Sequence, residues 1–285
     1  MGIILAILLF SAIIIIHELG HFLLAKANGI RVDEFSLGLG PTLFGKQFGE
    51  TKFSVKLLPF GGACMMGEDD VEDISEGSFN SKSVWARMSV IVAGPLFNLI
   101  LAWILCMIMI AWVGYRTPVV GGVMDGYSAQ EQGLSEGDVI TKIGGRSVHI
   151  WNDISLYNLT HSEEKEVEIT YKRDGKTHTA VLEPRQKEGD TAPLLGVTGG
   201  KMERPGFFGT LKYGAYTVKY WIDYTVDSLR MLVTGRVGMK DLSGPVGIVS
   251  AVDGVYQEAA PAGLSVIILN LMNIGILITA NLGVM

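Results

Sequence analysis

The sequence predicts a multipass α-helical membrane protein with a membrane-associated β-hairpin and an inserted small α+β domain. Hydrophobic residues make up 48% of the 285 residues, which is high for a soluble protein, yet charged residues still account for 18%. The apolar residues are gathered into long runs that a polar, glycine-punctuated stretch separates. This mixture indicates membrane-spanning helices together with a water-exposed domain.

The first expected element is a transmembrane helix over residues 1–27, which carries the most informative motif of the chain. An apolar run, Ile3–Ile16, leads directly into His17, Glu18 and His21 in the motif H-E-L-G-H. Residues four apart lie on one face of a helix, so two imidazoles at this spacing can bind one zinc ion while the Glu between them activates a water. Ionisable groups at membrane depth are costly, so we expect them to serve a function.

Residues 28–83 form the next expected region, a glycine-rich loop and β segment. Lys52–Leu57 alternates polar and apolar residues, as a half-buried strand does, and Pro59 and Gly61-Gly62 end it. The acidic stretch at 68–76 is expected to be a solvated loop.

A second transmembrane helix is expected over residues 84–114, followed by the inserted domain over 115–185. The helix contains Gly94-Pro95 and Asn98, which are tolerated in a membrane where protein covers them. The domain has short polar strands, with a hairpin turn at Asp174-Gly175. Gly137 and Asp138 are expected to form a structural turn before the next strand.

The remaining elements are a linker at 186–206, an amphipathic helix at 207–233, a loop at 234–262 and a third transmembrane helix at 263–285. Charged residues interrupt the helix at 207–233, which favours a position at the membrane interface over a span.

Basic residues near the first two spans predict the topology. Lys26, Arg31, Lys82 and Arg87 flank the loop between these spans, and only Arg116 is close on the other side. The loop is therefore expected in the cytoplasm and the inserted domain outside. Because the basic residues follow the first apolar run, a cleaved signal peptide is the less favoured alternative.

Charge and cysteine content exclude some other functions. The net charge of -6 argues against nucleic acid as a main partner. Cys64 and Cys106 have no metal-binding spacing, so we interpret both as thiols that bind no metal.

Several segments resemble the site-2 protease family of intramembrane zinc metalloproteases. They are H-E-L-G-H, F-S-L-G-L-G-P at Phe35–Pro41, L-L-P-F-G-G-A at Leu57–Ala63, A-G-P-L-F-N at Ala93–Asn98 and L-S-G-P-V-G-I at Leu242–Ile248. Residues 115–185 are similar to a PDZ domain, with G-L-S-E-G-D-V-I at Gly133–Ile140 and I-G-G-R-S-V at Ile143–Val148. This combination resembles the bacterial, PDZ-containing branch with the regulator of sigma-E protease and its Gram-positive relatives.

The resemblance implies a zinc metalloendopeptidase that cleaves transmembrane segments of single-pass membrane proteins, such as anti-sigma factors or remnant signal peptides. His17 and His21 are then ligands of Zn²⁺, Glu18 is the general base, and the β segment re-enters the membrane. The resemblance also implies a multipass protein of the bacterial inner membrane, embedded in the lipid bilayer, with the PDZ-like domain outside. Peptide C-termini are candidate ligands of that domain, which could instead act only as a spacer.

This sequence departs from the family at the third zinc ligand. In the family this ligand is an Asp in an N-x-x-P-x-x-x-L-D-G motif, which follows a span similar to the one expected at 263–285. No L-D-G occurs in this sequence, so we expect a chain truncated before this ligand and before a fourth transmembrane helix. The alternative function is therefore a catalytically incomplete, membrane-anchored PDZ adaptor.

The candidate substrate-binding residues are Asn98, Gly61 and Gly62. Asn98 could contact substrate or only join two helices, and the glycines could admit substrate or only form a turn. Because a membrane helix hides its amides, the substrate must unwind, and we expect Lys52–Leu58 to be the edge strand with which it pairs.

Overall fold

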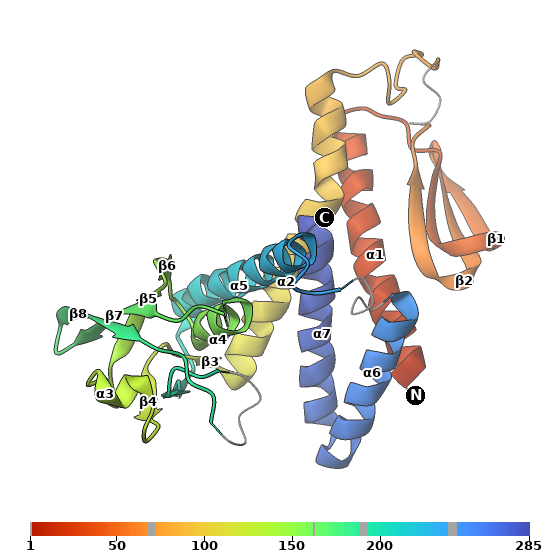
Figure 1. Ribbon diagram of the computed structural model, residues 1–285. Helices are drawn as coiled ribbons and strands as arrows, with labels where there is room; N and C mark the ends of the chain where they lie inside the picture. Colours follow the sequence, from red (N-terminus) through yellow and green to blue (C-terminus); the bar gives the residue numbers. More distant parts are fainter. Residues whose placement is uncertain (1, 68–71, 162, 188–192, 239–243) are drawn as a thin grey trace. The chain divides into compact units, whose positions relative to one another are not determined.

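The computed structural model describes residues 2–67, 72–161, 163–187, 193–238 and 244–285 (Figure 1). Part of the acidic loop expected at 68–76 and part of Leu242–Ile248 lie outside these ranges. The chain forms two compact units, one comprising Met1–Leu105 with Met239–Met285 and the other Cys106–Gly238.

The first unit contains the helices α1 (Gly2–Ala27), the first part of α2 (Val84–Val113), α6 (Pro245–Ala259) and α7 (Leu264–Val284). Over the described residues, α1, α2 and α7 are long and apolar enough to cross a membrane. Gly20 lets α1 approach α2 closely, since a β-carbon there would lie 2.5 Å from the carbonyl oxygen of Ala93. Small residues at helix contacts are typical of membrane bundles.

One expectation for this unit is wrong. Residues 234–262 were expected to be a loop, but Pro245–Ala259 is helical and packs against α1 and α7 (Figure 1). Proline is well accommodated at the first position of a helix, where its missing N–H has no helical acceptor. The glycines of this segment hid the apolar helical spacing, and a short 3-10 turn, η2 (Ala260–Ala262), joins α6 to α7.

A small sheet lies beside α1 (Figure 1) and consists of β1 (Glu34–Phe48) and β2 (Thr51–Met65). Both strands are bent, so residues 34–37 pair with 52–55 on one side and with 62–65 on the other. Residues 42–48 pair with the far side of 51–56. The sheet therefore has four rows, and residues 62–65 form the outer row near α1.

This register corrects the expected edge strand. Residues 52–55 are paired on both sides, so they are interior, and the outer row beside α1 is Gly62–Met65. Alternation of polar and apolar residues reports the two faces of a strand and says nothing about its edges. The left-handed backbone of Gly61, with φ of 87°, lies just before this row.

The second unit contains the last turns of α2 and the inserted domain. Its elements are β3 (Tyr115–Arg116), β4 (Val120–Val123), α3 (Ser128–Glu131), β5 (Val139–Ile143), β6 (Arg146–Ser147), α4 (Trp151–Thr160), β7 (Val167–Arg173), β8 (Lys176–Leu182), β9 (Val197–Gly199), β10 (Met202–Glu203) and α5 (Phe207–Val233). A four-stranded antiparallel sheet has the order β6-β5-β7-β8. Its core includes the fully buried Ile140, Ile169 and Leu182.

Residues 193–206 contain two short strands, although 186–206 was expected to be a linker. β9 pairs with β4 and β10 pairs with β3, both antiparallel, and Leu195 is buried in the core. The domain therefore extends beyond residue 185 to Glu203. Its closing strands are too short for the alternation pattern to detect them.

Helix α5 is fixed to this domain by aromatic packing and one ion pair. Tyr213, Tyr216 and Tyr220 pack on a small core that includes Tyr115. The Arg146 guanidinium donates hydrogen bonds to both carboxylate oxygens of Asp227, at 2.5 and 3.0 Å. One of the charged residues that distinguish 207–233 from a membrane span, Asp227, thus links α5 to the inserted domain.

Candidate metal centre

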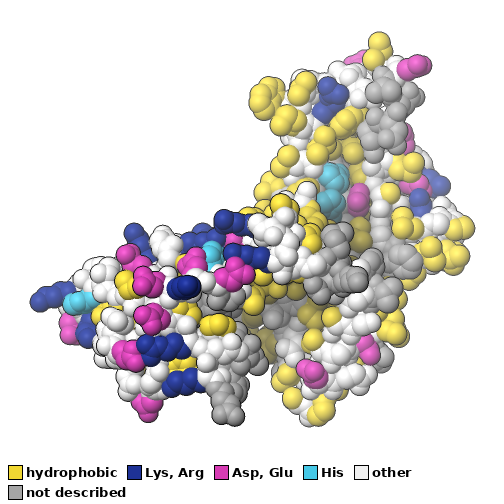
Figure 2. Space-filling view, viewed as in Figure 1, with side chains coloured by type: hydrophobic (Ala, Val, Ile, Leu, Met, Phe, Trp, Pro, Cys, Tyr) yellow, Lys and Arg dark blue, Asp and Glu magenta, His cyan; other side chains and the backbone are white. Residues whose placement is uncertain are grey.

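The H-E-L-G-H motif lies on α1 where this helix faces α2. His17 and His21 are one turn apart, with ring centroids 4.8 Å apart and ring planes at 78°. Both rings are half-buried, as is Glu18. Figure 2 shows histidine and acidic side chains next to each other within a mainly hydrophobic surface of this unit.

The two imidazoles point their Nε2 atoms at the same place, above Gly94 of α2. A β-carbon on Gly94 would lie 2.6 Å from Nε2 of His17 and closer still to Nε2 of His21. The absence of a side chain at Gly94 thus leaves room for a small ligand between the two nitrogens. Imidazole nitrogens suit zinc, so these residues fit a Zn²⁺ ion.

The other ring nitrogen of each histidine, Nδ1, lies next to a group from α2. Nδ1 of His21 lies 2.7 Å from the carbonyl oxygen of Val90, which can only accept a hydrogen bond. His21 therefore carries its hydrogen on Nδ1, and Nε2 keeps a lone pair for a metal. Nδ1 of His17 lies 3.0 Å from the side-chain amide of Asn98.

Across the described ranges, no group of three or more His, Cys, Asp or Glu side chains is arranged to hold a metal ion. The two histidines are thus candidate donors, and the third ligand that the family resemblance implies is not among the described side chains. A catalytic zinc site uses three protein ligands and one open position.

Glu18 lines an adjacent cavity of about 320 Å³ with mostly apolar walls. The lining residues are Glu18, His21, Cys64, Met66, Phe79, Val90 and Ile91. The outer row of the sheet passes this place, since a β-carbon on Gly62 would lie 3.3 Å from Cγ of Glu18. The arrangement puts a carboxylate, the Nε2 atoms of both histidines and a strand edge within one small region.

The structure thus brings together His17, Glu18, His21, Asn98 and Gly62. Gly61 differs, because the space above it is filled by Leu39 and does not open toward the histidines.

The roles of two further residues of the site, Gly94 and Val90, were not predicted from the sequence. Gly94 was noted only within Gly94-Pro95 and the family-like A-G-P-L-F-N segment, and the sequence did not reveal that it faces the Nε2 atoms of both histidines. Val90 contributes its backbone carbonyl to His21, which no side-chain pattern reveals.

Comparison with known proteins adds to this geometry. The model of peptidase family M50 matches residues 5–285. A candidate zinc metalloprotease of Clostridium acetobutylicum is 38% identical over 284 residues, covering 100% of this chain and 81% of the relative. The regulator of sigma-W protease RasP of Bacillus subtilis is 29% identical over 364 residues, covering 98% of this chain and 84% of RasP.

One solved structure also matches part of the chain. The PDZ domain of an SdrC-like protein from Listeria monocytogenes is 28% identical and covers 30% of this chain and 88% of its own, but its TM-score of 0.25 does not establish a shared fold. The family match rests on the sequence of nearly the whole chain. The chain belongs to peptidase family M50, the site-2 protease family of zinc metalloproteases.

Proposed function

We propose that this metalloprotease cleaves transmembrane segments of single-pass membrane proteins, with His17 and His21 as zinc ligands and Glu18 as general base. The observation that carries the proposal is the convergence of the two Nε2 atoms above Gly94, between two helices that are long and apolar enough to cross a membrane. A hydrolytic centre at this position acts on segments that lie in the bilayer.

In the proposed hydrolysis, zinc and Glu18 have separate roles. Zinc supplies Lewis-acid activation of a water and of the scissile carbonyl. Glu18 accepts the proton of the attacking water and passes it to the leaving amine. Glu18 suits this role because it lines the cavity next to His21 and has the outer row of the sheet beside it.

The substrate is proposed to bind as an added β-strand along Gly62–Met65. This row pairs with β1 on one side and passes Glu18, so a strand on its other side would bring a peptide bond to the histidines. An unwound helix needs such pairing, because unsatisfied amides are costly in an apolar environment. Alternate side chains of an added strand point to one face, and the 320 Å³ cavity is apolar enough to take one of them.

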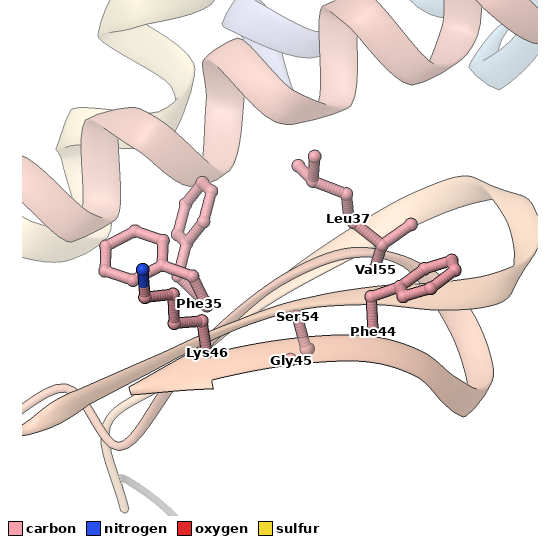
Figure 3. Close-up of a pocket in the computed structure, with 8 residues that line it drawn as sticks. Phe35, Leu37, Phe44, Gly45, Lys46, Ser54 and Val55 are labelled. Atoms are coloured by element: carbon pink, nitrogen blue, oxygen red, sulfur yellow. The ribbon is translucent and has the colours of Figure 1, made fainter. Parts of the chain in front are cut away.

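The surface of the sheet supports its location at membrane level. Phe44 is 75% exposed and Leu43 and Leu57 are also exposed, which is unusual for a small sheet in water. Phe35, Leu37, Phe44 and Val55 line a cavity on the face of the sheet (Figure 3), and the cavity has a volume of about 280 Å³. An apolar sheet face with an open cavity fits contact with lipid or with an unwound apolar segment.

The substrate class follows from the relatives. RasP is named a regulator of sigma-W, so we include membrane-bound regulators of sigma factors among the substrates of this chain. Remnant signal peptides, which are short single spans, remain a second substrate class. The inserted domain is proposed to lie on the extracytoplasmic side, because basic residues cluster in the loop between α1 and α2.

The test is cleavage of a single-pass membrane reporter by the full-length wild-type protein and by its Glu18→Gln variant, both incorporated into lipid vesicles. Glu18→Gln keeps the side chain's size and removes the base, so cleavage should fall at least 100-fold while zinc content stays unchanged. Equal cleavage by both proteins would overturn the assignment of Glu18. Reporter binding without cleavage by the wild-type chain would favour the adaptor alternative.

A further inference from the structure

Asn98 has surroundings that its expected role in substrate binding does not explain. The residue is 0% exposed, and its amide nitrogen lies 3.0 Å from Nδ1 of His17. Its Oδ1 is buried and has no hydrogen-bond partner in the described part of the chain. Its backbone carbonyl accepts a hydrogen bond from Thr279 Oγ1 of α7 at 3.1 Å, so α7 supports this turn of α2.

Zinc binding determines where His17 carries its hydrogen. Nε2 faces the position above Gly94 and must offer a lone pair, so Nδ1 of the neutral ring bears the hydrogen. An amide NH₂ opposite Nδ1–H would set two donors against each other. Rotation of the carboxamide by half a turn brings Oδ1 to Nδ1–H instead, and this rotation breaks no hydrogen bond of Oδ1.

We propose that Asn98 is a positioning residue that accepts a hydrogen bond from Nδ1–H of His17 through Oδ1. It thereby holds the ring in the tautomer and orientation that zinc requires. The inference rests on the proposed zinc site and deepens it. Val90 does the same for His21 through its backbone carbonyl, at 2.7 Å.

The two supports come from one helix and are spaced to match the motif. Val90 and Asn98 lie two turns apart on α2, with Gly94 midway between them, so all three fall on one face. The face of α2 thus presents an acceptor, a gap and a second acceptor to the two histidines of α1. This placement explains why an amide is buried in an apolar helix contact, where a side chain with an unmet polar group is costly.

The experiment compares three variants of the full chain in detergent. Asn98→Asp retains an acceptor at the same place, and Asn98→Leu removes it at similar volume. Asn28→Leu is the matched control, because Asn28 also joins α1 to α2, through Ser89 Oγ at 3.0 Å, away from the histidines.

The first measurement is zinc release to a competing chelator. We expect Asn98→Leu to weaken zinc binding about 10- to 100-fold, whereas Asn98→Asp and Asn28→Leu stay close to wild type. Equal zinc affinity of Asn98→Leu and wild type would overturn the proposal.

The second measurement needs no metal and separates this proposal from the zinc assignment. Nitrogen-15 NMR of labelled histidine reports the tautomer of His17 in the zinc-free chain, with a His17→Gln spectrum to assign the signal. We expect the Nδ1–H tautomer in wild type and a mixture of tautomers in Asn98→Leu. A wild-type Nε2–H tautomer would mean that Asn98 donates through its NH₂, which overturns the inference. Zinc content unaffected by His21→Ala would instead refute the zinc site itself.

Discussion

Gly94 of α2 faces His17 of α1 so closely that a β-carbon on Gly94 would lie 2.6 Å from Nε2 of His17. The same carbon would lie still closer to Nε2 of His21. The gap above a single glycine therefore defines the place where both imidazole nitrogens meet. A metal ion bound there would touch α1 through its ligands and would be enclosed by α2.

The first prediction is that Gly94→Ala abolishes zinc binding. Alanine favours helix over glycine by about 1 kcal/mol, so the helix itself should tolerate the change. The added methyl would occupy the metal position, so we expect zinc content to fall at least 10-fold with little change in thermal unfolding. Elemental mass spectrometry of the purified protein measures this.

Gly254→Ala is the matched control for this prediction. Gly254 lies inside α6, and a β-carbon there would meet nothing within 4 Å. The control should retain wild-type zinc. Normal zinc content in Gly94→Ala would show that the metal does not lie between the two Nε2 atoms.

A second prediction concerns the outer row of the sheet. Gly62→Val would place side-chain atoms against Cγ of Glu18 and the carbonyl oxygen of Ser36, which lie 3.3 and 3.0 Å from the β-carbon position. Cleavage of the reporter should fall about 10-fold or more, while zinc stays bound because both histidines are untouched. Vesicle assays with zinc quantification check both parts.

Gly49→Asn, at the turn between β1 and β2, serves as its control. Gly49 has φ of 60° and open space around it, and Asn tolerates this backbone region. Full activity of Gly62→Val would argue against substrate passing along this row.

How far the sequence predicted this site depends on the kind of interaction. His17, Glu18 and His21 could be singled out as candidates because a zinc hydrolase motif needs particular side chains at helical spacing, and the structure places them side by side on α1. The support of His21 by Val90 was not predictable, because a backbone carbonyl is present at every residue and only tertiary packing selects one. Asn98 was singled out as polar in an apolar helix, but its partner depends on how α1 and α2 pack.

The fold, too, could be predicted from the sequence only in part. Long apolar runs predicted α1, α2 and α7, because burial in a bilayer requires their length and composition. The row order of the sheet was not predictable, since the bends that let residues 34–37 pair on both sides arise from glycines whose backbone angles the sequence does not specify. Helix α6 was missed for a related reason, as its glycines weakened a helical pattern that tertiary contacts stabilise.

A third prediction addresses the inserted domain through Asp138. This carboxylate is 1% exposed and accepts hydrogen bonds from Arg173 at 2.7 Å and from the Ser135 N–H at 2.9 Å. Burial raises the pKa of Asp138, but these hydrogen bonds outweigh it and hold the pKa below its ordinary value. The stabilisation is therefore present above the ordinary carboxyl pKa of about 4 and is lost as pH falls through the lower, folded value.

Asp138→Asn should thus destabilise the domain by about 2 kcal/mol at pH 7 and by much less at low pH. Hydrogen exchange of β5 and β7 at several pH values measures the difference. Glu131→Gln is the control, because its pair with Arg185 is exposed and should contribute little. A destabilisation independent of pH would contradict a role for the charge of Asp138.

A fourth prediction concerns the anchoring of α5. Asp227→Ala leaves Arg146 without its two carboxylate contacts and should cost about 1.5–3 kcal/mol. We expect faster hydrogen exchange in α4 and β6 and a lower unfolding temperature. Glu163→Gln, which loses only an exposed pair with Arg236, should behave as wild type. Unchanged exchange in Asp227→Ala would mean that the tyrosine packing alone holds the helix.

The proposed activity requires a zinc ion bound by His17 and His21. The measurement is zinc per chain by elemental mass spectrometry on detergent-purified wild type, His21→Ala and Glu18→Gln. We expect close to one zinc per chain in wild type and Glu18→Gln, and a loss of nearly all of it in His21→Ala, because we propose Glu18 as a base and His21 as a ligand. Equal zinc in wild type and His21→Ala would contradict the central claim.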